Sequence, residues 1–452
     1  MTLALAAGLV GCTDDADPSP PGTAGSPSPT ASEVAEGPVQ RPLVAREDPR
    51  PALTQDLLDA RAAAVRAGDL DAFVATLAPA RLTDKGFRAQ QKRWFRNLQQ
   101  LPVGRLAYTV RDNTVQQTGF EVDRDAPGVY VPYVQTTLRL RGFDDAPVSR
   151  NGAVTVARTP RGYRVVSVDD ADELLDAGDA AIGRAPWDLT ALDVRRQREG
   201  GSDTLLLLDD GSAAQGDTLL ALLGAASTRV RDAVPFPWDG SVVAYATGDD
   251  KVIGAIRDVP GGDVANVGAL AFPIYEEPNR GAVAAFRFAL NPAVLTSDDL
   301  FLRRLVTHEL AHVALGVRDD GAPTWISEGA AEYVGALGLA PTETRIAVAA
   351  VDRARSIRQR LDAGRPVELR MPPTDTFNSG DSDWHYGLSW YAMEWIAANR
   401  GQSSVWRLVR AMARGDGTPD DRQDRVLRKV IGVGEAELVS NAIDLILDTY
   451  DR

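Results

Sequence analysis

The chain has 452 residues, of which 44% are hydrophobic and 25% are charged. This composition is ordinary for a globular protein, and the length allows two or three domains with sizeable cores. The net charge of −14 disfavours binding to nucleic acid, and no basic stripe offsets it, so we expect no nucleic-acid partner. A single cysteine, Cys12, excludes an intramolecular disulfide.

The first residues form an apolar run that ends at this cysteine. Leu9-Val10-Gly11-Cys12 resembles the lipobox of bacterial lipoproteins. The resemblance implies a lipoprotein signal over residues 1–12, lipidation of Cys12, and a cell-membrane location, lipid-anchored on the extracytoplasmic face. No later apolar run is long enough to cross a bilayer, so the membrane would be a partner through this anchor alone. The alternative interpretation is an apolar N-terminus with an isolated cysteine.

The segment that follows is too polar to form a core. Residues 13–50 begin with a stretch rich in Pro, Ser, Thr, Gly, Ala and Asp, which is typical of disorder. We interpret them as a tether between the lipidated cysteine and the first folded domain.

A small α+β domain is predicted over residues 51–185. Apolar residues recur at helical spacing from Leu53 to Leu77, with a break at Gly68, after which Asp69 is a suitable N-cap for a second helix. A third amphipathic helix is expected near residues 87–101, and four alternating segments then predict strands: 106–112, 130–141, 152–158 and 163–168. This order resembles the cone-shaped fold of nuclear transport factor 2 and polyketide cyclases, which often binds a ligand or acts as a spacer.

A second unit is predicted over residues 190–452. Its first half favours a sheet with one helix, and from Ser297 onward the chain is predicted to be helical, which together is an α+β pattern. The predicted elements are a buried strand at 205–208, a helix at 216–234, and strands at 242–247, 265–273 and 283–290.

The helical half contains the segment His308-Glu309-Leu310-Ala311-His312. Two histidines at positions i and i+4 lie on one helix face, where their ring nitrogens can share one Zn²⁺ and the adjacent Glu309 can act as a base toward water. Alone, this five-residue pattern is as compatible with a coincidence in a packed helix as with a zinc site. A third candidate ligand, Glu328, follows in Trp325-Ile326-Ser327-Glu328-Gly329. Zinc hydrolases usually have three protein ligands, which strengthens the zinc interpretation.

The two segments together resemble the gluzincin peptidases, the HExxH…E members of the peptidase MA-like set, which include aminopeptidase-N-like and thermolysin-like enzymes. The resemblance implies a zinc-dependent peptidase acting on peptides or proteins, with His308, His312 and Glu328 as metal ligands and Glu309 as catalytic base. It also implies a domain with a mixed sheet and a helical C-terminal half. The loop between His312 and Glu328 is a few residues shorter than in those two groups.

Glu332 lies one helical turn beyond Glu328 and competes with it as a ligand. We assign Glu332 instead to a hydrogen bond with a zinc-binding histidine, which would fix the orientation of that ring. The alternative for Glu332 is a solvated charge on the helix surface.

Two further catalytic candidates lie in the segment 383–395, which resembles the aminopeptidase-N-like helix that begins with an oxyanion-stabilising tyrosine. Tyr386 matches that tyrosine, and the adjacent His385 is the second candidate. The stretch Gly268-Ala269-Leu270-Ala271-Phe272 lacks the carboxylate that grips a free amine in those aminopeptidases, so we favour an endopeptidase. The rival hypothesis is a non-catalytic, zinc-stabilised binding or scaffold lipoprotein, although a purely structural zinc site needs no base such as Glu309.

Overall fold

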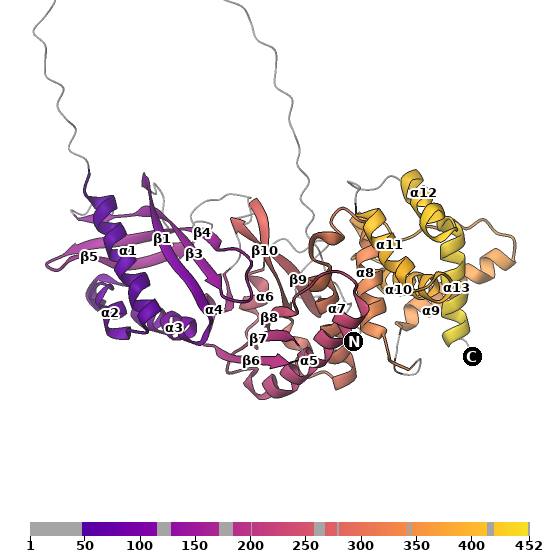
Figure 1. Ribbon diagram of the computed structural model, residues 1–452, viewed down its shortest axis with the longest axis horizontal. Coiled ribbons are helices and arrows are strands. Elements are labelled where there is room, and N and C mark those ends of the chain that lie inside the picture. Colours follow the sequence, from indigo (N-terminus) through magenta and orange to yellow (C-terminus); the bar gives the residue numbers. More distant parts are fainter. Residues whose placement is uncertain are drawn as a thin grey trace, which may run out of the picture.

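The computed structural model describes residues 48–114, 128–170, 184–199, 201–256, 267–277, 280–340, 343, 346–413 and 420–450. Cys12, the predicted lipobox and nearly all of the predicted tether therefore lie outside the described residues. The described part is elongated, with one sheet at one end, a second sheet in the middle and a group of helices at the other end (Figure 1). None of its described helices is both long and apolar enough to cross a membrane.

The first part begins with three helices: α1 (Arg50–Ala67), α2 (Leu70–Ala75) and α3 (Phe87–Gln100). The break between α1 and α2 follows from two residues. Gly68 has a φ of 69°, in the left-handed region where an L side chain is disfavoured, and it ends α1. The Asp69 carboxylate then accepts a 2.8 Å hydrogen bond from the Ala72 N–H and so begins α2.

These helices pack on an antiparallel sheet of β1 (Val103–Thr114), β2 (Val129–Tyr130), β3 (Pro132–Leu140), β4 (Val148–Thr159) and β5 (Gly162–Asp170). The strand order is β1-β3-β4-β2, and β5 pairs with β4. The order of helices and strands agrees with the prediction, whereas the likeness to nuclear transport factor 2 stays a prediction.

The second sheet has the strand order β6-β7-β8-β10-β9. Its strands are β6 (Asp193–Glu199), β7 (Ser202–Leu208), β8 (Ser241–Tyr245), β9 (Ala269–Glu277) and β10 (Arg280–Leu290). The β7–β8 and β8–β10 pairs are parallel and the two outer pairs are antiparallel, so the sheet is mixed, as predicted.

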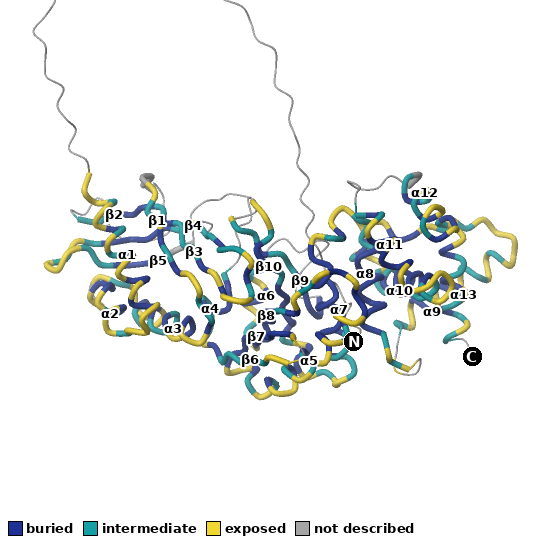
Figure 2. The backbone as a smooth tube through the Cα atoms, in the orientation of Figure 1, coloured by how far each residue is buried: buried dark blue, intermediate teal, exposed yellow. Residues whose placement is uncertain are grey.

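Alternate residues of this sheet belong to two different cores. Leu206 and Leu208 of β7 pack with the long helix α5 (Gly216–Ala233) and with the C-terminal helices, whereas Leu205 and Leu207 join the core of the first part of the chain. This alternation follows from the two-residue repeat of a strand. Leu205 and Leu207 belong to one core with buried residues of α1, α2 and α3. Figure 2 colours the buried residues of both parts dark blue.

The C-terminal half is helical, as predicted. Its helices are α7 (Asp299–Leu315), α8 (Thr324–Ala336), α9 (Val348–Asp362), α10 (Ser382–Arg400), α11 (Gln402–Met412), α12 (Asp420–Ile431) and α13 (Glu435–Tyr450). Helix α8 lies so close to α10 that a Cβ atom at Gly329 would be 2.6 Å from the Ser389 carbonyl oxygen. The glycine after Glu328 therefore permits this close helix packing.

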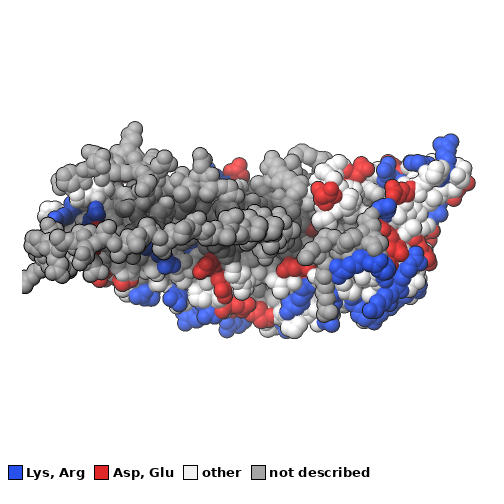
Figure 3. Space-filling view, turned by 90° about the horizontal axis from the view of Figure 1, so that it is seen from above, with Lys and Arg blue, Asp and Glu red and all other residues white. Residues whose placement is uncertain are grey.

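Charged side chains of both signs are interspersed on the face shown in Figure 3. On helix α9, Arg355 pairs with Asp352 at 2.6 Å and Arg353 pairs with Asp381 at 3.8 Å.

The structure differs from the predicted elements at short or polar segments. Strand β6 and the one-turn helices α4 (Pro186–Leu189) and α6 (Lys251–Gly254) were not predicted, and β9 begins and ends four residues later than predicted. Strand β6 is polar because it lies at the edge of the sheet, where backbone pairing with β7 alone places it.

Candidate metal centre

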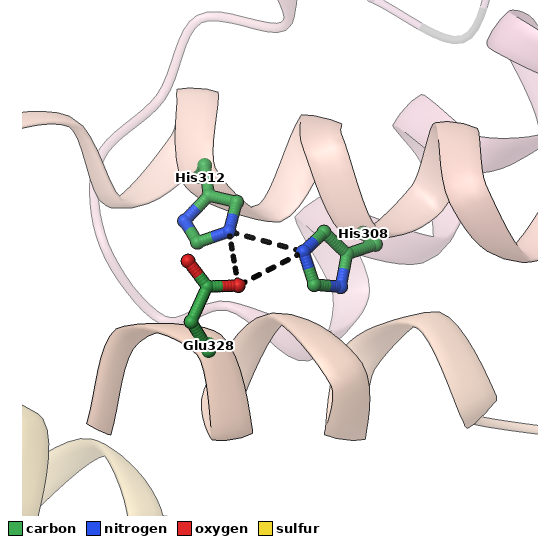
Figure 4. A group of neighbouring side chains, drawn as sticks. All are labelled: His308, His312 and Glu328. Atoms are coloured by element: carbon green, nitrogen blue, oxygen red, sulfur yellow. Dashed lines mark hydrogen bonds and ion pairs between the residues drawn. The ribbon is translucent and has the colours of Figure 1, made fainter. Parts of the chain in front are cut away.

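The two histidines lie on a buried helix that sits between the second sheet and α8. At its start, the Asp298 carboxylate accepts a 2.9 Å hydrogen bond from the Phe301 N–H, and every residue from Leu305 to Leu315 is buried. His308 and His312 are one turn apart on the face toward α8, and Glu328 projects from α8 toward both (Figure 4).

Three atoms of these side chains converge at metal-binding distances. The His308 Nε2 and His312 Nε2 atoms are 3.2 Å apart, and Glu328 Oε2 lies 3.4 Å from the first and 3.6 Å from the second. Two ligands bound tetrahedrally to one zinc ion at about 2.0–2.1 Å are about 3.3–3.4 Å apart. The observed triangle therefore fits three corners of a zinc tetrahedron.

The chemistry of the three donors also fits a metal. All three side chains are essentially inaccessible, and Glu328 Oε2 is a buried atom without a hydrogen-bond donor in the described part of the chain. A buried carboxylate oxygen without a donor is costly unless a cation balances it. Within the described residues, this is the one group of three His, Cys, Asp or Glu side chains that could hold a metal ion.

The second ring nitrogen of His308 faces Glu332. Its Nδ1 atom is 3.4 Å from Glu332 Oε1, and the other carboxylate oxygen of Glu332 pairs with the Arg304 guanidinium. The Arg304 guanidinium lies over the Trp390 ring, 4.4 Å from its centre. Arg304 was not predicted as a site residue, although its position one turn before His308 on the same helix face is a usable signal.

Glu309, between the two histidines, is also buried, with 1% of its surface exposed. The Ala271 backbone N–H on β9 donates a hydrogen bond to its carboxylate, while Glu309 Oε2 has no partner within the described residues. Burial raises the pKa of the Glu309 carboxyl to about 8, and the nearby charge of Glu328 adds to the rise. Glu309 is therefore a carboxylate with basic character beside the convergent ligands.

The same surroundings shift the pKa values of the other ionisable groups. Burial lowers the pKa of His308, but Glu328 and Glu332 outweigh burial and raise it to about 10. Burial lowers the pKa of His312. Burial raises the pKa of Glu332, but Arg304 and His308 outweigh it and hold the value at about 2, so Glu332 is ionised.

His385 and Tyr386 lie in the first turn of α10, beside the segment that precedes the helix. The Tyr386 hydroxyl donates a 3.1 Å hydrogen bond to Asn378 Oδ1, and the His385 Nδ1 atom lies 2.8 Å from the Phe377 carbonyl oxygen. A carbonyl accepts only, so Nδ1 carries the proton and the Nε2 atom of a neutral His385 has none to donate. Tyr386 is therefore the better candidate for an oxyanion donor, a role that stays a prediction.

The sequence was compared with protein-family models, curated proteins and solved structures. No protein-family model matches the sequence. No curated protein matches it either.

Among solved structures, similarity was found to M1 zinc metallopeptidases. A variant of the enzyme from Deinococcus radiodurans bound to a Tyr-Ser-Ala substrate has 12% sequence identity and a TM-score of 0.33, over 75% of this chain and 61% of that chain. The M1 zinc metallopeptidase of the same organism has 13% identity and a TM-score of 0.31, over 75% of this chain and 60% of that one. The chain thus spans about three fifths of these proteins, and a similarity at this level supports no conclusion about its activity.

Proposed function

We propose that this protein is an extracytoplasmic, lipid-anchored, zinc-dependent endopeptidase. The observation that carries the proposal is the convergence of His308, His312 and Glu328 at zinc-binding distances, with the buried carboxylate of Glu309 beside them. The proposed location rests on the lipobox-like sequence that ends at Cys12.

Each residue has a role in this proposal. His308, His312 and Glu328 would hold zinc, which supplies a Lewis acid that polarises the scissile carbonyl and lowers the pKa of a water molecule to about 7. Glu309 takes a proton from the attacking water and delivers it to the leaving amine. Glu332 holds the His308 ring, and Tyr386 donates to the oxyanion that develops on the substrate.

Strand β9 offers a place for the peptide backbone. It is the last strand of the second sheet among the described residues, and the Ala271 N–H points to Glu309 rather than to β10. Backbone groups two residues along a strand point the same way, so Ala269 also presents its backbone on the side of Glu309. An extended substrate paired with this edge would run past Glu309, as expected for cleavage within a chain.

The alternative is a binding or scaffold protein in which zinc only stabilises the fold. The same triangle of ligands supports it. A structural zinc site is closed by four protein ligands and has no use for a buried base. The described cluster has three ligands with Glu309 adjacent, which favours the enzyme.

Zinc analysis and an activity assay on the purified protein test the proposal together. The protein is expected to hold about one zinc ion per chain, and a His308→Ala, His312→Ala double variant is expected to hold none. Glu309→Gln should retain zinc and lose at least about 10²-fold in the hydrolysis of a quenched fluorescent peptide library, because the amide cannot accept a proton.

The matched control for Glu309→Gln is Glu394→Gln. Glu394 is a partly buried glutamate on α10 that accepts a hydrogen bond from Trp390 Nε1, which glutamine can still accept. The control should be fully active. A zinc-loaded protein that cleaves nothing would favour the scaffold, and unchanged turnover in Glu309→Gln would exclude Glu309 as the base.

A further inference from the structure

The loop between α7 and α8 carries a buried carboxylate that the proposed mechanism does not use. Asp319 is 3% exposed, and neither of its carboxylate oxygens has a hydrogen-bond partner on another residue of the described part. The loop around it is fixed, because Arg318 Nη2 donates to the Pro237 carbonyl at 3.0 Å and the Ala322 N–H donates to the Asp319 carbonyl at 2.9 Å. The two oxygens are therefore held in a fixed loop without a partner on another described residue.

The position of this loop puts Asp319 at one end of the candidate metal centre. Helix α7 ends three residues after His312, and α8 begins four residues before Glu328. At 1.5 Å per residue these are about 4.5 and 6 Å along the two helices. Asp319 also lies close enough to Glu328 for the charge of Glu328 to act on it.

Asp319 differs from the other carboxylates around the centre because the one group that favours its ionised form is its own backbone N–H. Glu332 is paired with Arg304, Glu328 faces the two histidines with which it would share zinc, and Glu309 accepts from a backbone N–H. The charges that act on Asp319 are those of Asp320 and Glu328, both negative, and together with burial they raise the pKa of the Asp319 carboxyl well above its ordinary value.

The centre is rich in buried carboxyl groups. Glu309, Glu328, Glu332 and Asp319 are all buried, and the Arg304 guanidinium pairs with Glu332. A buried carboxylate without a counter-charge is disfavoured by several kcal/mol, so a cationic ligand at Asp319 would be bound strongly.

We propose that Asp319 recognises a hydrogen-bond-donating organic cation on the substrate, an ammonium or guanidinium group near the scissile bond. This inference rests on the proposed peptidase function and names its substrate class. The cation can come from a Lys or Arg side chain or from the peptide's own terminal amine, since the two share this chemistry. A second metal ion is a poorer occupant, because the exposed neighbour Asp320 is the one further carboxylate that the loop offers.

Peptide pairs that differ by one charge test the proposal. Each pair carries Lys or norleucine at one position around the cleaved bond, and each member is made with a free and with an acetylated N-terminus. The wild type should prefer one cationic peptide by about 10- to 100-fold in kcat/KM, the value of a charge-assisted hydrogen bond. Dependence on Lys or on the free amine identifies the source of the cation.

Asp319→Asn should remove this preference and leave zinc content and the cleavage of the neutral peptide unchanged. The control is Asp320→Asn, the same change at the exposed adjacent residue, which should keep the preference. Because the change replaces a buried carboxyl that has no partner on another described residue, Asp319→Asn should unfold at the same temperature as the wild type or higher. An equal preference in both proteins, or an Asp319→Asn protein that fails to fold, overturns the proposal.

Binding separates failure of this inference from failure of the proposed function. The same peptides are titrated calorimetrically into zinc-loaded Glu309→Gln protein, with and without Asp319→Asn. Binding of the cationic peptide that depends on Asp319, with no cleavage by the wild type, would retain the cation site and reject the peptidase. Cleavage without any charge preference would retain the peptidase and reject the cation site. Stabilisation of the wild type by CaCl₂ alone, lost in Asp319→Asn, would assign the site to an inorganic cation and overturn the proposal.

Discussion

At the residue scale, Arg304 is the outermost support of the candidate metal centre. Its guanidinium pairs with Glu332, which faces His308 Nδ1, and is itself held against the Trp390 ring. Arg304→Met would leave Glu332 buried without its cation, so the carboxylate would take up a proton and hold the His308 ring less firmly. We predict that zinc affinity falls about 10- to 100-fold, measured by competition with a chromophoric chelator.

The neighbouring Arg303 provides the control for this prediction. Arg303→Met removes the same charge one residue away, where no described ion pair reaches Glu332, and zinc affinity should change less than about twofold, because charges outside such a pair contribute little. Equal losses in both variants would mean that Arg304 acts through the overall charge of α7 and not through Glu332.

A substitution of Tyr386 tests the proposed stabilisation of the oxyanion. Tyr386→Phe keeps the ring, which packs against Phe377 at 4.9 Å, and removes the hydroxyl. If that hydroxyl donates to the oxyanion, kcat should fall about 10²- to 10³-fold with little change in KM and full zinc content. Tyr391→Phe, on the same helix, should be nearly silent. A fully active Tyr386→Phe beside an inactive His385→Ala would move the donor to His385.

At the scale of elements, the sequence predicts most of what surrounds the site. The periodic apolar pattern and the Asp69 cap predicted α1 and α2. The continuous apolar run predicted β7, which is buried along its whole length. Strand β6 could not be found in this way. Its polar side chains carry no pattern, and its place depends on pairing with a neighbour.

In the candidate site too, some residues follow from the sequence pattern and others depend on how the elements pack. His308 and His312 are four residues apart on one helix, so spacing alone predicts that they meet. The approach of Glu328 depends on how α8 packs on α7 and was predictable only through a family resemblance. Asp319 gave no signal, because burial of a loop carboxylate follows from the packing of the elements around it.

At the scale of the whole molecule, the predicted anchor concerns residues outside the described part of the chain. A Cys12→Ser protein should move from the membrane fraction to the soluble fraction, because no acyl chain can be attached. Fractionation of cells with detergent-free washing measures this. A Cys12→Ser protein that stays with the membrane through those washes would mean that the lipobox interpretation is wrong.

The two sheets of the molecule are joined by a buried ion pair. Asp144, in the turn after β3, lies 2.7 Å from the guanidinium of Arg287 on β10, and both side chains are at least 95% buried. Arg287 also donates to the Tyr245 hydroxyl at 2.9 Å, and Asp144 accepts from the Leu140 N–H at 2.6 Å. These bonds lie within the core that the first part of the chain shares with the second sheet.

Breaking this pair should destabilise the two sheets together. Asp144→Ala leaves the Arg287 guanidinium buried without a counter-charge, which typically costs about 3–5 kcal/mol. Because the core is continuous, urea unfolding followed by tryptophan fluorescence and by circular dichroism should give one coincident transition, moved to lower urea. An Asp144→Ala, Arg287→Met double variant should recover part of the loss, since no charge then remains buried.

An exposed ion pair of similar length provides the control. Arg195 and Asp217 lie 2.6 Å apart, but the Asp217 side chain is 97% exposed. Asp217→Ala should therefore change the free energy of unfolding by less than about 1 kcal/mol. Two separate transitions in Asp144→Ala, with only one of them moved, would show that the sheets fold independently and that the shared core contributes little. A loss no larger than that of Asp217→Ala would mean that water replaces the missing carboxylate, because the guanidinium then keeps its hydrogen bonds.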